Sequence, residues 1–365
     1  MARSAFTTSP ARIKAIGIGG GGCNAITRMV RESIKGVEFI AMNTDAQALA
    51  MAEVPVRIQL GEKLTRGLGA GGDPSVGTKA AEESRQAVQE IVAGADMVFI
   101  TAGMGGGSGT GGIPVVAEVA KQSGALTIAI VTKPFSFEGA RRSKVAEEGI
   151  LKLIDKVDTL VIIPNDRMLE LCDAKTTVDN AFKLADDVLR LGVRAIAEVV
   201  TVPGLINLDF ADIRSIMRGA GPAWMSTGRG KGQNRAQDAA KAALASPMLD
   251  VSISGAKGVL FNVTGGNDLT LFECNEAAEI IAQSVDPEAN IIFGVVFDQQ
   301  MEGELSLTII ATGFTAQYGA GAPTELELRR LLRGVGEESL DVPSFMRRST
   351  NHSSAQMSNM PKIPR

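Results

Sequence analysis

The chain of 365 residues is 45% hydrophobic and 21% charged, which is ordinary for a globular protein of two or three domains, and its net charge of −4 argues against nucleic acid as a partner. One histidine, His352, lies in a polar tail and the three cysteines are far apart, so histidine-based catalysis, disulfide frameworks and a protein-bound metal site are not expected. The N-terminus has no signal-peptide core and no run of about eighteen apolar residues occurs, so we expect a soluble cytoplasmic protein without membrane insertion.

Short apolar runs bounded by glycine, asparagine or threonine predict five strands in the first half of the chain. Helical stretches lie between them, for example Gly77–Val92 and Ile113–Gln122. Strands that alternate with helices indicate an α/β fold with a mainly parallel sheet. The five strands are expected at Ile13–Ile18, Val37–Met42, Met97–Thr101, Leu126–Thr132 and Thr159–Ile163.

A long amphipathic helix is predicted next, over Val178–Val202, because this stretch lacks proline and its apolar residues recur with helical spacing. Pro203-Gly204 ends it. A helix of this length in mid-chain is typical of a connector between two domains.

A smaller α+β domain follows, after which the pattern fades into a linker and a polar tail. Its strands are predicted at Gly258–Thr264, Ile291–Phe297 and Leu305–Thr312, and its helices at Asn234–Ala245 and Glu273–Val285. We therefore divide the chain into a tail (1–11), a first domain (12–177), a connecting helix (178–203), a second domain (204–314), a linker (315–340) with a short helix at Glu325–Leu332, the peptide "DVPSFMRR" (341–348) and a tail (349–365).

The stretch Gly103–Gly112 holds seven glycines directly after the predicted strand "MVFIT". We interpret it as a loop that ends at a helix with Pro114 in its first turn. A strand, a glycine loop and a helix in this order point backbone N–H groups at one spot, which is typical of a phosphate site. Hydroxyl groups of Ser108 and Thr110 can add donors.

Two more glycine-rich segments occur in the same domain. Gly17, Gly19 and Gly22 in "GIGGGGCNA" satisfy GxGxxG, which taken alone fits a dinucleotide site or a tight turn about equally well. The segment "GLGAGGDPSVGTK" is close to a P-loop, but its Lys and Thr are exchanged and no strand leads into it, so that reading is rejected. Three such segments in one α/β domain favour a nucleotide phosphate.

Several motifs resemble those of the FtsZ family, the bacterial cell-division relatives of tubulin. "GGGSGTG" at 105–111 is similar to the tubulin signature GGGTGSG, with Ser and Thr exchanged. "GGGGCNA", "NTDAQAL", "LTRGLGAGG", "KPFSFEG", "IPNDRML" and "NLDFAD" extend the resemblance over about residues 12–314. It implies a tubulin-like GTPase domain, a long central helix and a smaller α+β second domain, in a GTPase that forms protofilaments at the division site.

The resemblance also implies a set of site residues for GTP or GDP, with Mg²⁺ bound mainly through the phosphates. Glu138 and Arg142 would approach the ribose and phosphates, and Asn165, Phe182 and Asp186 would hold the guanine. From spacing alone, Phe182 is more typical of core packing and Asp186 of a solvated helix face. The full implied set is Gly20, Gly21, Gly22, Cys23, Asn24, Asn43, Thr44, Asp45, Ala70, Gly71, Gly72, Gly103, Gly105, Gly106, Gly107, Ser108, Gly109, Thr110, Pro134, Glu138, Arg142, Asn165, Phe182 and Asp186.

The motif "NLDFAD" supplies the candidate catalytic residues Asn207, Asp209 and Asp212. Read locally, Asp209 is a helix N-cap and Asp212 occupies the third helical position. The resemblance implies instead that this loop meets the nucleotide of the next subunit, so that head-to-tail self-assembly completes the active site and activates hydrolysis.

The peptide "DVPSFMRR" resembles the family's docking segment for membrane-tethering and regulatory division proteins, with Val342, Pro343, Phe345, Met346 and Arg347 as contacts. Ser108, Gly111-Gly112 and Cys23 depart from the usual family pattern, and the linker is short. The alternatives are a tubulin-superfamily filament for plasmid segregation or cell shape, and an NAD-binding oxidoreductase, which leaves Gly103–Gly112 unexplained.

Overall fold

A computed structural model describes residues 11–170, 172, 176–201, 209–248 and 253–314. Several predictions lie outside these described residues, among them the end of the long helix at Pro203-Gly204. The others concern residues 1–10 of the N-terminal tail, Asn207, the linker 315–340 with its helix at Glu325–Leu332, the docking peptide 341–348 and the tail 349–365.

The first domain is built on a parallel sheet in the strand order β3-β2-β1-β4-β5-β6. The five predicted strands are confirmed, with ends that shift by at most two residues. The short edge strand β3 was not predicted, because its four residues carry too few apolar side chains to stand out. The strands are β1 (Ile13–Ile18), β2 (Val37–Asn43), β3 (Val56–Gln59), β4 (Met97–Gly103), β5 (Leu126–Lys133) and β6 (Thr159–Pro164).

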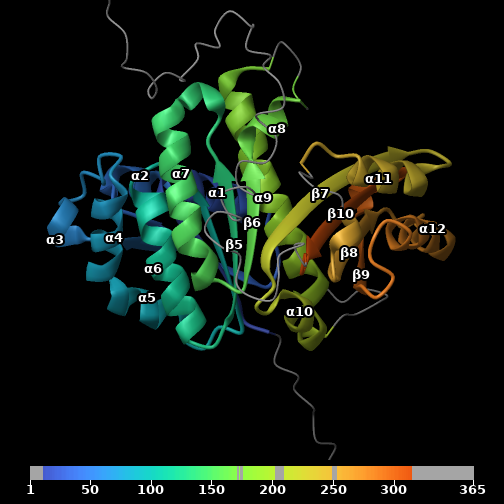
Figure 1. Cartoon of the computed structure of the whole chain (residues 1–365), viewed down its shortest axis with the longest axis horizontal. Helices are drawn as coiled ribbons and strands as arrows, with labels where there is room; N and C mark the ends of the chain where they lie inside the picture. Colours follow the sequence, from blue (N-terminus) through green and yellow to red (C-terminus); the bar gives the residue numbers. More distant parts are fainter. Residues whose placement is uncertain (1–10, 171, 173–175, 202–208, 249–252, 315–365) are drawn as a thin grey trace, which may run out of the picture.

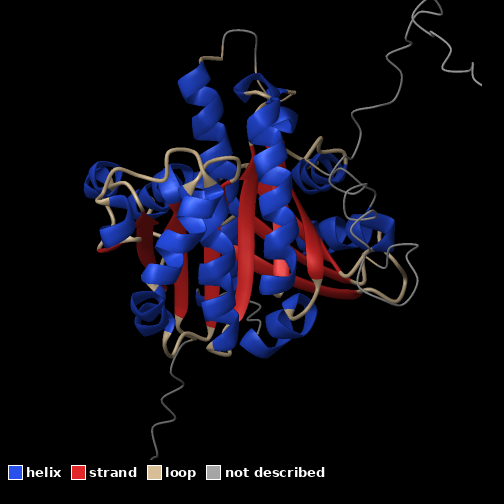
Figure 2. Ribbon diagram, turned by 60° about the vertical axis from the view of Figure 1, so that its left-hand side comes forward, coloured by secondary structure: helices blue, strands red, loops and turns tan. Residues whose placement is uncertain are grey.

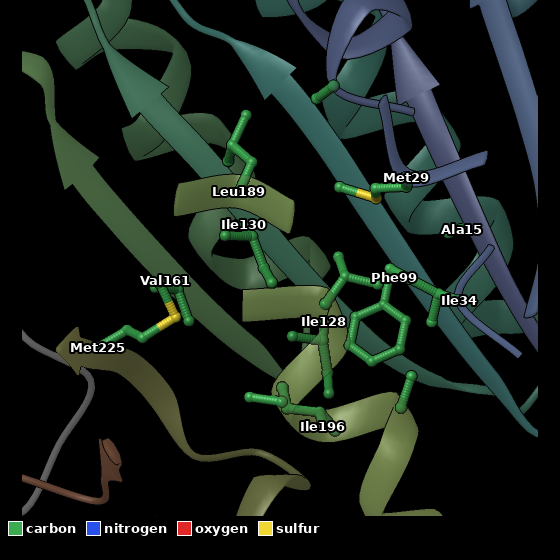
Figure 3. Packing of buried hydrophobic residues seen from close by; sticks show 14 of the residues in the cluster. Ala15, Met29, Ile34, Phe99, Ile128, Ile130, Val161, Leu189, Ile196 and Met225 are labelled. Atoms are coloured by element: carbon green, nitrogen blue, oxygen red, sulfur yellow. The ribbon is translucent and has the colours of Figure 1, made fainter. Parts of the chain in front are cut away.

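Helices cover both faces of this sheet, as Figure 2 shows. α1 (Gly19–Arg31) and α9 (Val178–Thr201) pack on one face, where Phe99, Ile128 and Ile196 point toward one another in a buried cluster (Figure 3). The other face carries a second buried cluster under α4 (Pro74–Glu83), α5 (Arg85–Val92), α6 (Ser108–Gln122) and α7 (Ala140–Leu153). The long helix predicted from Val178 is thereby confirmed as α9.

The helix predicted over Gly77–Val92 is wrong in one respect, because the structure divides it into α4 and α5 at Ser84. The Ser84 hydroxyl accepts a hydrogen bond from the Gly61 N–H at 2.9 Å. This bond joins the break between the two helices to a segment 23 residues earlier in the chain. The remaining small elements of the domain are α2 (Ala46–Met51), α3 (Glu62–Thr65), η1 (Ser136–Glu138), η2 (Ile154–Lys156) and α8 (Asn165–Leu169).

The second domain adds four strands to the same sheet, in the order β7-β10-β8-β9 (Figure 1). β7 (Gly221–Lys231) joins the two halves: its first residues pair in parallel with β6, and the rest pairs antiparallel with β10 (Glu304–Thr312). The other elements are α10 (Phe210–Met217), α11 (Arg235–Leu244), η3 (Ile253–Gly255), β8 (Gly258–Gly265), α12 (Leu271–Ala282), β9 (Asn290–Phe297) and η4 (Gln299–Met301).

β7 was not predicted, because its glycines are typical of turns. The structure gives them a packing role instead. A Cβ on Gly228 would lie 2.1 Å from the Ala239 carbonyl oxygen, and one on Gly230 would lie 2.0 Å from that of Arg235. Glycine at these positions lets α11 lie directly on the strand.

Candidate functional site

A cavity of about 420 Å³ opens at the carboxyl ends of β1, β4, β5 and β6. In an open α/β sheet this is the edge at which ligands bind. Most of the predicted nucleotide-binding residues meet here, drawn from segments that are far apart in the chain. The cavity is lined by Gly19, Gly20, Gly21, Asn24, Gly103, Met104, Gly105, Gly106, Gly107, Ser108, Gly109, Thr132, Pro134, Glu138, Arg142, Asn165, Phe182, Ala185 and Asp186.

The first glycine segment is the N-terminus of α1 rather than a separate loop, since the helix begins at Gly19. Its N-cap residue, Ile18, makes no capping hydrogen bond, and its first turn holds no acidic residue. The unpaired N–H groups and the positive end of the helix dipole therefore face the cavity. A Cβ on Gly20 would meet no atom within 4 Å, so the space beside this backbone is open to a ligand.

The second glycine segment behaves in the same way, because α6 begins at Ser108 and its N-cap, Gly107, makes no side-chain capping bond. The prediction that the helix starts near Pro114 is wrong; Pro114 lies inside α6. Space beside Gly106 is also open within 4 Å. Two uncapped helix N-termini thus converge on one cavity, an arrangement suited to a polyphosphate.

Other glycines of these segments are required by packing. A Cβ on Gly17 would lie 2.3 Å from the Gly22 carbonyl oxygen, and one on Gly22 would lie 2.5 Å from that of Thr101. A Cβ on Gly111 would lie 2.1 Å from the Pro74 carbonyl oxygen, which lets α4 and α6 approach closely. The glycine-rich stretch therefore serves both the cavity and the packing beneath it.

The segment at 70–72 lies beside the second glycine segment without lining the cavity itself. A Cβ on Gly107 would lie 2.8 Å from the Ala70 Cβ. Gly71 and Gly72 have φ values of 59° and 77°, in the left-handed region, and a Cβ on either would meet no atom within 4 Å. The segment thus lies against Gly107, which lines the cavity.

The segment that follows β2 touches the cavity wall through one side chain. The hydroxyl groups of Thr44 and Ser108 lie 2.5 Å apart. Asn43 is buried and its Oδ1 accepts from the Asp45 N–H at 3.3 Å. The Asp45 carboxylate caps α2 by accepting from the Gln47 and Ala48 N–H groups. Thr44 is thus joined to the cavity through Ser108, which lines it.

Glu138 and Arg142 form an ion pair on one wall of the cavity, with 2.5 Å between Arg142 Nη1 and Glu138 Oε2. The other carboxylate oxygen of Glu138 accepts from the Phe135 N–H at 2.9 Å. Asp166, at the start of α8, accepts from both the N–H and the hydroxyl of Ser136. These bonds fix the 134–138 turn against the helix that carries Asn165.

The opposite end of the cavity has the features of a base site. Asn165 is buried, and its Oδ1 has no hydrogen-bond partner among the described residues. An unpaired buried amide oxygen is costly, and a ligand donor would satisfy it. Phe182 is 40% exposed and meets Phe135 edge-on at 5.3 Å, so it belongs to the cavity surface rather than to the core.

Asp186 faces the same cavity from the next turn of α9 and pairs with Arg28 of α1, with 3.1 Å between Nε and Oδ2. Burial raises the pKa of Asp186 to about 6, and the charge of Arg28 opposes that rise. A carboxylate at this place can accept from two neighbouring N–H groups of a planar base.

Some predicted residues do not line the cavity. Besides Gly22 and the residues at 43–45 and 70–72, these are Cys23 and Thr110. The Cys23 thiol is buried, contacts the carbonyl oxygens of Gly17 and Met42, and has its pKa raised to about 12 by burial. The Thr110 hydroxyl accepts from the Gly105 N–H at 2.8 Å and so braces the glycine turn from below.

The cavity also has lining residues that were not predicted for it: Gly19, Met104, Thr132 and Ala185. Gly19 belongs to the GxGxxG pattern and Ala185 lies three residues after Phe182, so both had a signal in the sequence. Thr132 and Met104 reach the cavity from the ends of β5 and β4, and only the fold brings them there.

Asp209 and Asp212 lie far from the cavity, at the other end of the sheet. Asp209 is the N-cap residue of α10 by position, but its side chain makes no capping bond, and both residues are exposed. The end of α10 lies at the start of β6, where Thr159 Oγ1 donates to the Met217 carbonyl oxygen. Asn165, in contrast, follows directly after β6.

The central helix α9 runs along the first domain, and α10 lies near one end of it (Figure 1). α9 begins at the cavity with Phe182 and Asp186 and ends at Thr201, whose hydroxyl contacts the Lys35 carbonyl oxygen at the opposite end of the domain. The helix advances about 22 Å from Asp186 to Thr201, at about 1.5 Å per residue. The carboxylates beyond its end cannot reach the cavity of their own chain.

Among the described residues, no group of three or more His, Cys, Asp or Glu side chains is placed to hold a metal ion. Within the same residues, no helix combines the length and the apolar character needed to cross a membrane.

Two family models match the chain. One, described as Tubulin/FtsZ family, GTPase domain, matches residues 12–173, and one described as FtsZ family, C-terminal domain, matches residues 221–315. The matched segments coincide with the two halves of the sheet.

Solved structures give the same picture. An empty FtsZ dimer from M. jannaschii is 44% identical and superposes with a TM-score of 0.82, over 85% of this chain and 90% of that chain. A tryptophan-to-tyrosine mutant of FtsZ from M. jannaschii is 45% identical, with a TM-score of 0.81 over 84% of this chain and 92% of that chain. CetZ2 from Haloferax volcanii, a protofilament with GTPγS bound, shares the fold with 19% identity and a TM-score of 0.71, over 89% of this chain and 98% of that chain.

Proposed function

This chain belongs to the FtsZ branch of the tubulin/FtsZ GTPase family, and on that premise we propose that it binds GTP in the cavity and hydrolyses it between two copies of itself. The observation that carries the proposal is the convergence of two uncapped helix N-termini, those of α1 and α6, on one cavity beside open space at Gly20 and Gly106.

The base end of the cavity supports guanine as the base. Guanine offers an N1–H and a 2-amino group side by side, and the Asp186 carboxylate can accept from both. Adenine has neither donor at these positions, and leaving the carboxylate unpaired would cost affinity. The unpaired Asn165 Oδ1 is a further acceptor, and Phe182 offers an aromatic face on which a base can stack.

The opposed positions of the cavity and of the acidic pair support hydrolysis at a subunit interface. Asp209 and Asp212 are exposed, and the carboxylate of Asp209 is not used to cap α10. A second copy placed end to end would present them to the γ-phosphate of its neighbour, where they would orient and polarise the attacking water. Asn207 would act beside them. Repetition of this head-to-tail contact gives a filament.

Mg²⁺ would neutralise phosphate charge in such a site. It would be held mainly by the nucleotide itself, and the segments at 43–45 and 70–72 would lie near the outer phosphates.

We further propose that the filament forms at the division site, because both domains match family models that include FtsZ. The peptide at 341–348 would then dock membrane-tethering and regulatory proteins. A filament for plasmid segregation or cell shape is the alternative function; a fluorescent fusion that fails to gather at the septum would favour it.

The decisive experiment mixes two variants that are each inactive for a different reason. Gly20→Ala places a methyl group in the open space beside α1 and should abolish GTP binding, while it leaves Asp209 and Asp212 intact. Asp212→Ala should bind GTP but fail to hydrolyse it. In a mixture, some interfaces join an intact cavity to an intact acidic pair, so phosphate release should reappear.

The control is the same mixture with Asp212→Ala carried on both proteins, which should release no phosphate at any ratio. The composite site would be refuted if either single variant hydrolysed GTP at the wild-type rate. It would also be refuted if the mixture released no phosphate although both proteins co-sedimented. Failure of the unaltered protein to bind GTP would refute the proposal as a whole.

A further inference from the structure

The ion pair between Arg28 and Asp186 joins the two helices that flank the cavity. Arg28 lies one helical turn after Asn24, which lines the cavity from α1, and Asp186 lines it from α9. The two side chains are 29% and 14% exposed, so water screens their attraction less than it would at an open surface. The pair therefore forms part of the cavity wall.

We infer that Arg28 is a positioning residue for base recognition, which holds the carboxylate of Asp186 in the orientation that a guanine base would meet. This inference rests on the proposed function, because it presumes a guanine nucleotide in the cavity. Arg28 Nε contacts one oxygen, Oδ2, at 3.1 Å. An ionised carboxylate offers about four acceptor sites, so both oxygens keep a free site for the base.

Arg28 also sets the charge of the carboxylate. Burial favours the neutral acid and raises the pKa of Asp186 to about 6, the neighbouring Asp187 adds to the rise, and Arg28 acts against both. A protonated carboxyl group has lost its charge and turns one oxygen into a donor, so it is a poor partner for two N–H groups.

The other charged groups around the cavity are already paired. Asp187 lies 3.6 Å from Arg190, which in turn forms an ion pair with Glu32. On the far wall, Arg142 is paired with Glu138. Within the described part of the chain, Arg28 is thus the ion-pair partner of Asp186.

The sign of the effect follows from these charges. In the unaltered protein, GDP affinity should fall as the pH drops through about 6, where Asp186 becomes protonated. Removal of Arg28 should raise the pKa of Asp186 further, because an opposite charge at this distance lowers a carboxyl pKa by roughly one to three units. The fall in affinity should then begin at a higher pH.

Calorimetric titration with GDP between pH 5.5 and 8.5 tests this, because GDP binding involves no hydrolysis. We expect Arg28→Gln to weaken binding about three- to tenfold at pH 7.5, to move the midpoint of the pH profile up by at least about one unit, and to lose less affinity at pH 8.5. Arg28→Lys, which keeps the charge, should retain a midpoint near that of the unaltered protein.

Arg31→Gln is the matched control. Arg31 lies one turn further along α1, is exposed, and pairs with Glu53 away from the cavity. It should leave both the affinity and the pH profile unchanged, and thermal unfolding without nucleotide should show that all variants are folded.

A pH profile of Arg28→Gln that runs parallel to that of the unaltered protein would overturn the inference and leave the proposed function standing, since the variant would then affect packing alone. GDP binding by Arg28→Gln as tight as that of the unaltered protein would do the same. Absence of GDP binding by the unaltered protein would instead overturn the proposed function itself.

Discussion

Thr44 and Ser108 come from different segments of the chain, yet their hydroxyl groups share a hydrogen bond of 2.5 Å at the N-terminus of α6. Thr44 follows β2 and Ser108 is the first residue of α6. The bond fixes the Ser108 hydroxyl at the helix N-terminus, where a phosphate oxygen would lie, and it joins the segment after β2 to the second glycine segment.

Ser108→Ala should therefore weaken GTP and GDP binding by about tenfold, because one hydrogen bond to a charged partner is lost. Ser108→Thr keeps the hydroxyl and should bind normally. Titration with labelled GDP measures both. Ser123→Ala, which removes a hydroxyl from the other end of the same helix, should have no effect on affinity. Equal affinities for Ser108→Ala and the unaltered protein would show that this hydroxyl does not contact the nucleotide.

Gly20 and Gly107 should respond to alanine in opposite ways. A Cβ on Gly20 would meet nothing within 4 Å, whereas one on Gly107 would lie 2.8 Å from the Ala70 Cβ and 2.9 Å from the Asp73 backbone nitrogen. Gly20→Ala should thus keep the melting temperature, or raise it slightly through helix propensity, while it abolishes nucleotide binding.

Gly107→Ala should lower the melting temperature even without nucleotide, because the 70–73 segment has to shift. Thermal unfolding and GDP titration of both variants separate the two effects. A Gly20→Ala protein that binds GDP normally would mean that the open space at α1 is not occupied by the ligand.

The glycine stretches also show how far the sequence alone reaches. Five of the six first-domain strands that the structure describes were predicted, because buried parallel strands appear as short continuous apolar runs, and only the short edge strand β3 was missed. The starts of α1 and α6 were not predicted, because glycine disfavours helices in isolation. Here glycine is required by contacts between distant segments, such as Gly111 against the Pro74 carbonyl oxygen at 2.1 Å. β7 was missed for the same reason.

The residues of the site also differ in whether the sequence alone could predict them. The lining glycines, Phe182 and Asp186 carry recognisable motifs or helical spacing. Arg28 and Thr132 do not, because their place at the cavity depends on how α1 lies against α9 and on where β5 ends. No local pattern in the chain encodes either relationship.

Asp186→Asn should change the base preference from guanine to xanthine. The amide oxygen can still accept from N1–H, but the amide NH₂ has to face the 2-amino group of guanine, donor against donor. Xanthine carries an oxygen at that position, which the amide can pair with. We expect GDP affinity to fall by a hundredfold or more, of the order expected when a site polar group is left unpaired.

Competition between GDP and xanthosine diphosphate at pH 7.5 measures this preference. The variant also lacks the titration of a carboxyl group near pH 6, so its residual affinity should vary less with pH in that range than that of the unaltered protein. Asp187→Asn is the control: it alters the adjacent carboxylate, which does not line the cavity. If Asp186→Asn kept the preference for guanine, Asp186 would be excluded as the residue that recognises the base.

Arg235 should be required for the stability of the second domain but not for nucleotide binding. Its side chain is 5% exposed and forms ion pairs with Asp268 and Glu273, each at 2.6 Å. These hydrogen bonds lower the pKa of both carboxyl groups. The ion pairs therefore stabilise the folded protein at neutral pH, and this contribution is lost as the pH falls through the lowered pKa values of Asp268 and Glu273.

Arg235→Met should lower the melting temperature at pH 7. The difference from the unaltered protein should shrink as the pH is lowered, because protonation of Asp268 and Glu273 removes ion pairs that only the unaltered protein has. Arg229→Met, at an exposed position on β7, serves as the control. A constant difference at every pH would assign the loss to packing of the arginine stem instead.

Asp212→Ala should separate binding from turnover. Asp212 lies in the first turn of α10, exposed and at the other end of the sheet from the cavity, so the variant should bind GTP with unchanged affinity. Its rate of phosphate release should fall by a factor of about 10²–10⁴, the usual contribution of a positioned acid or base.

Asp238→Ala, which removes an acidic residue from the first turn of α11, is the control and should retain full activity. Both should be assayed over a range of protein concentrations, because a site shared between copies makes the specific activity of the unaltered protein rise with concentration. Specific activity that is independent of concentration, together with normal turnover by Asp212→Ala, would mean that each chain hydrolyses GTP with its own residues.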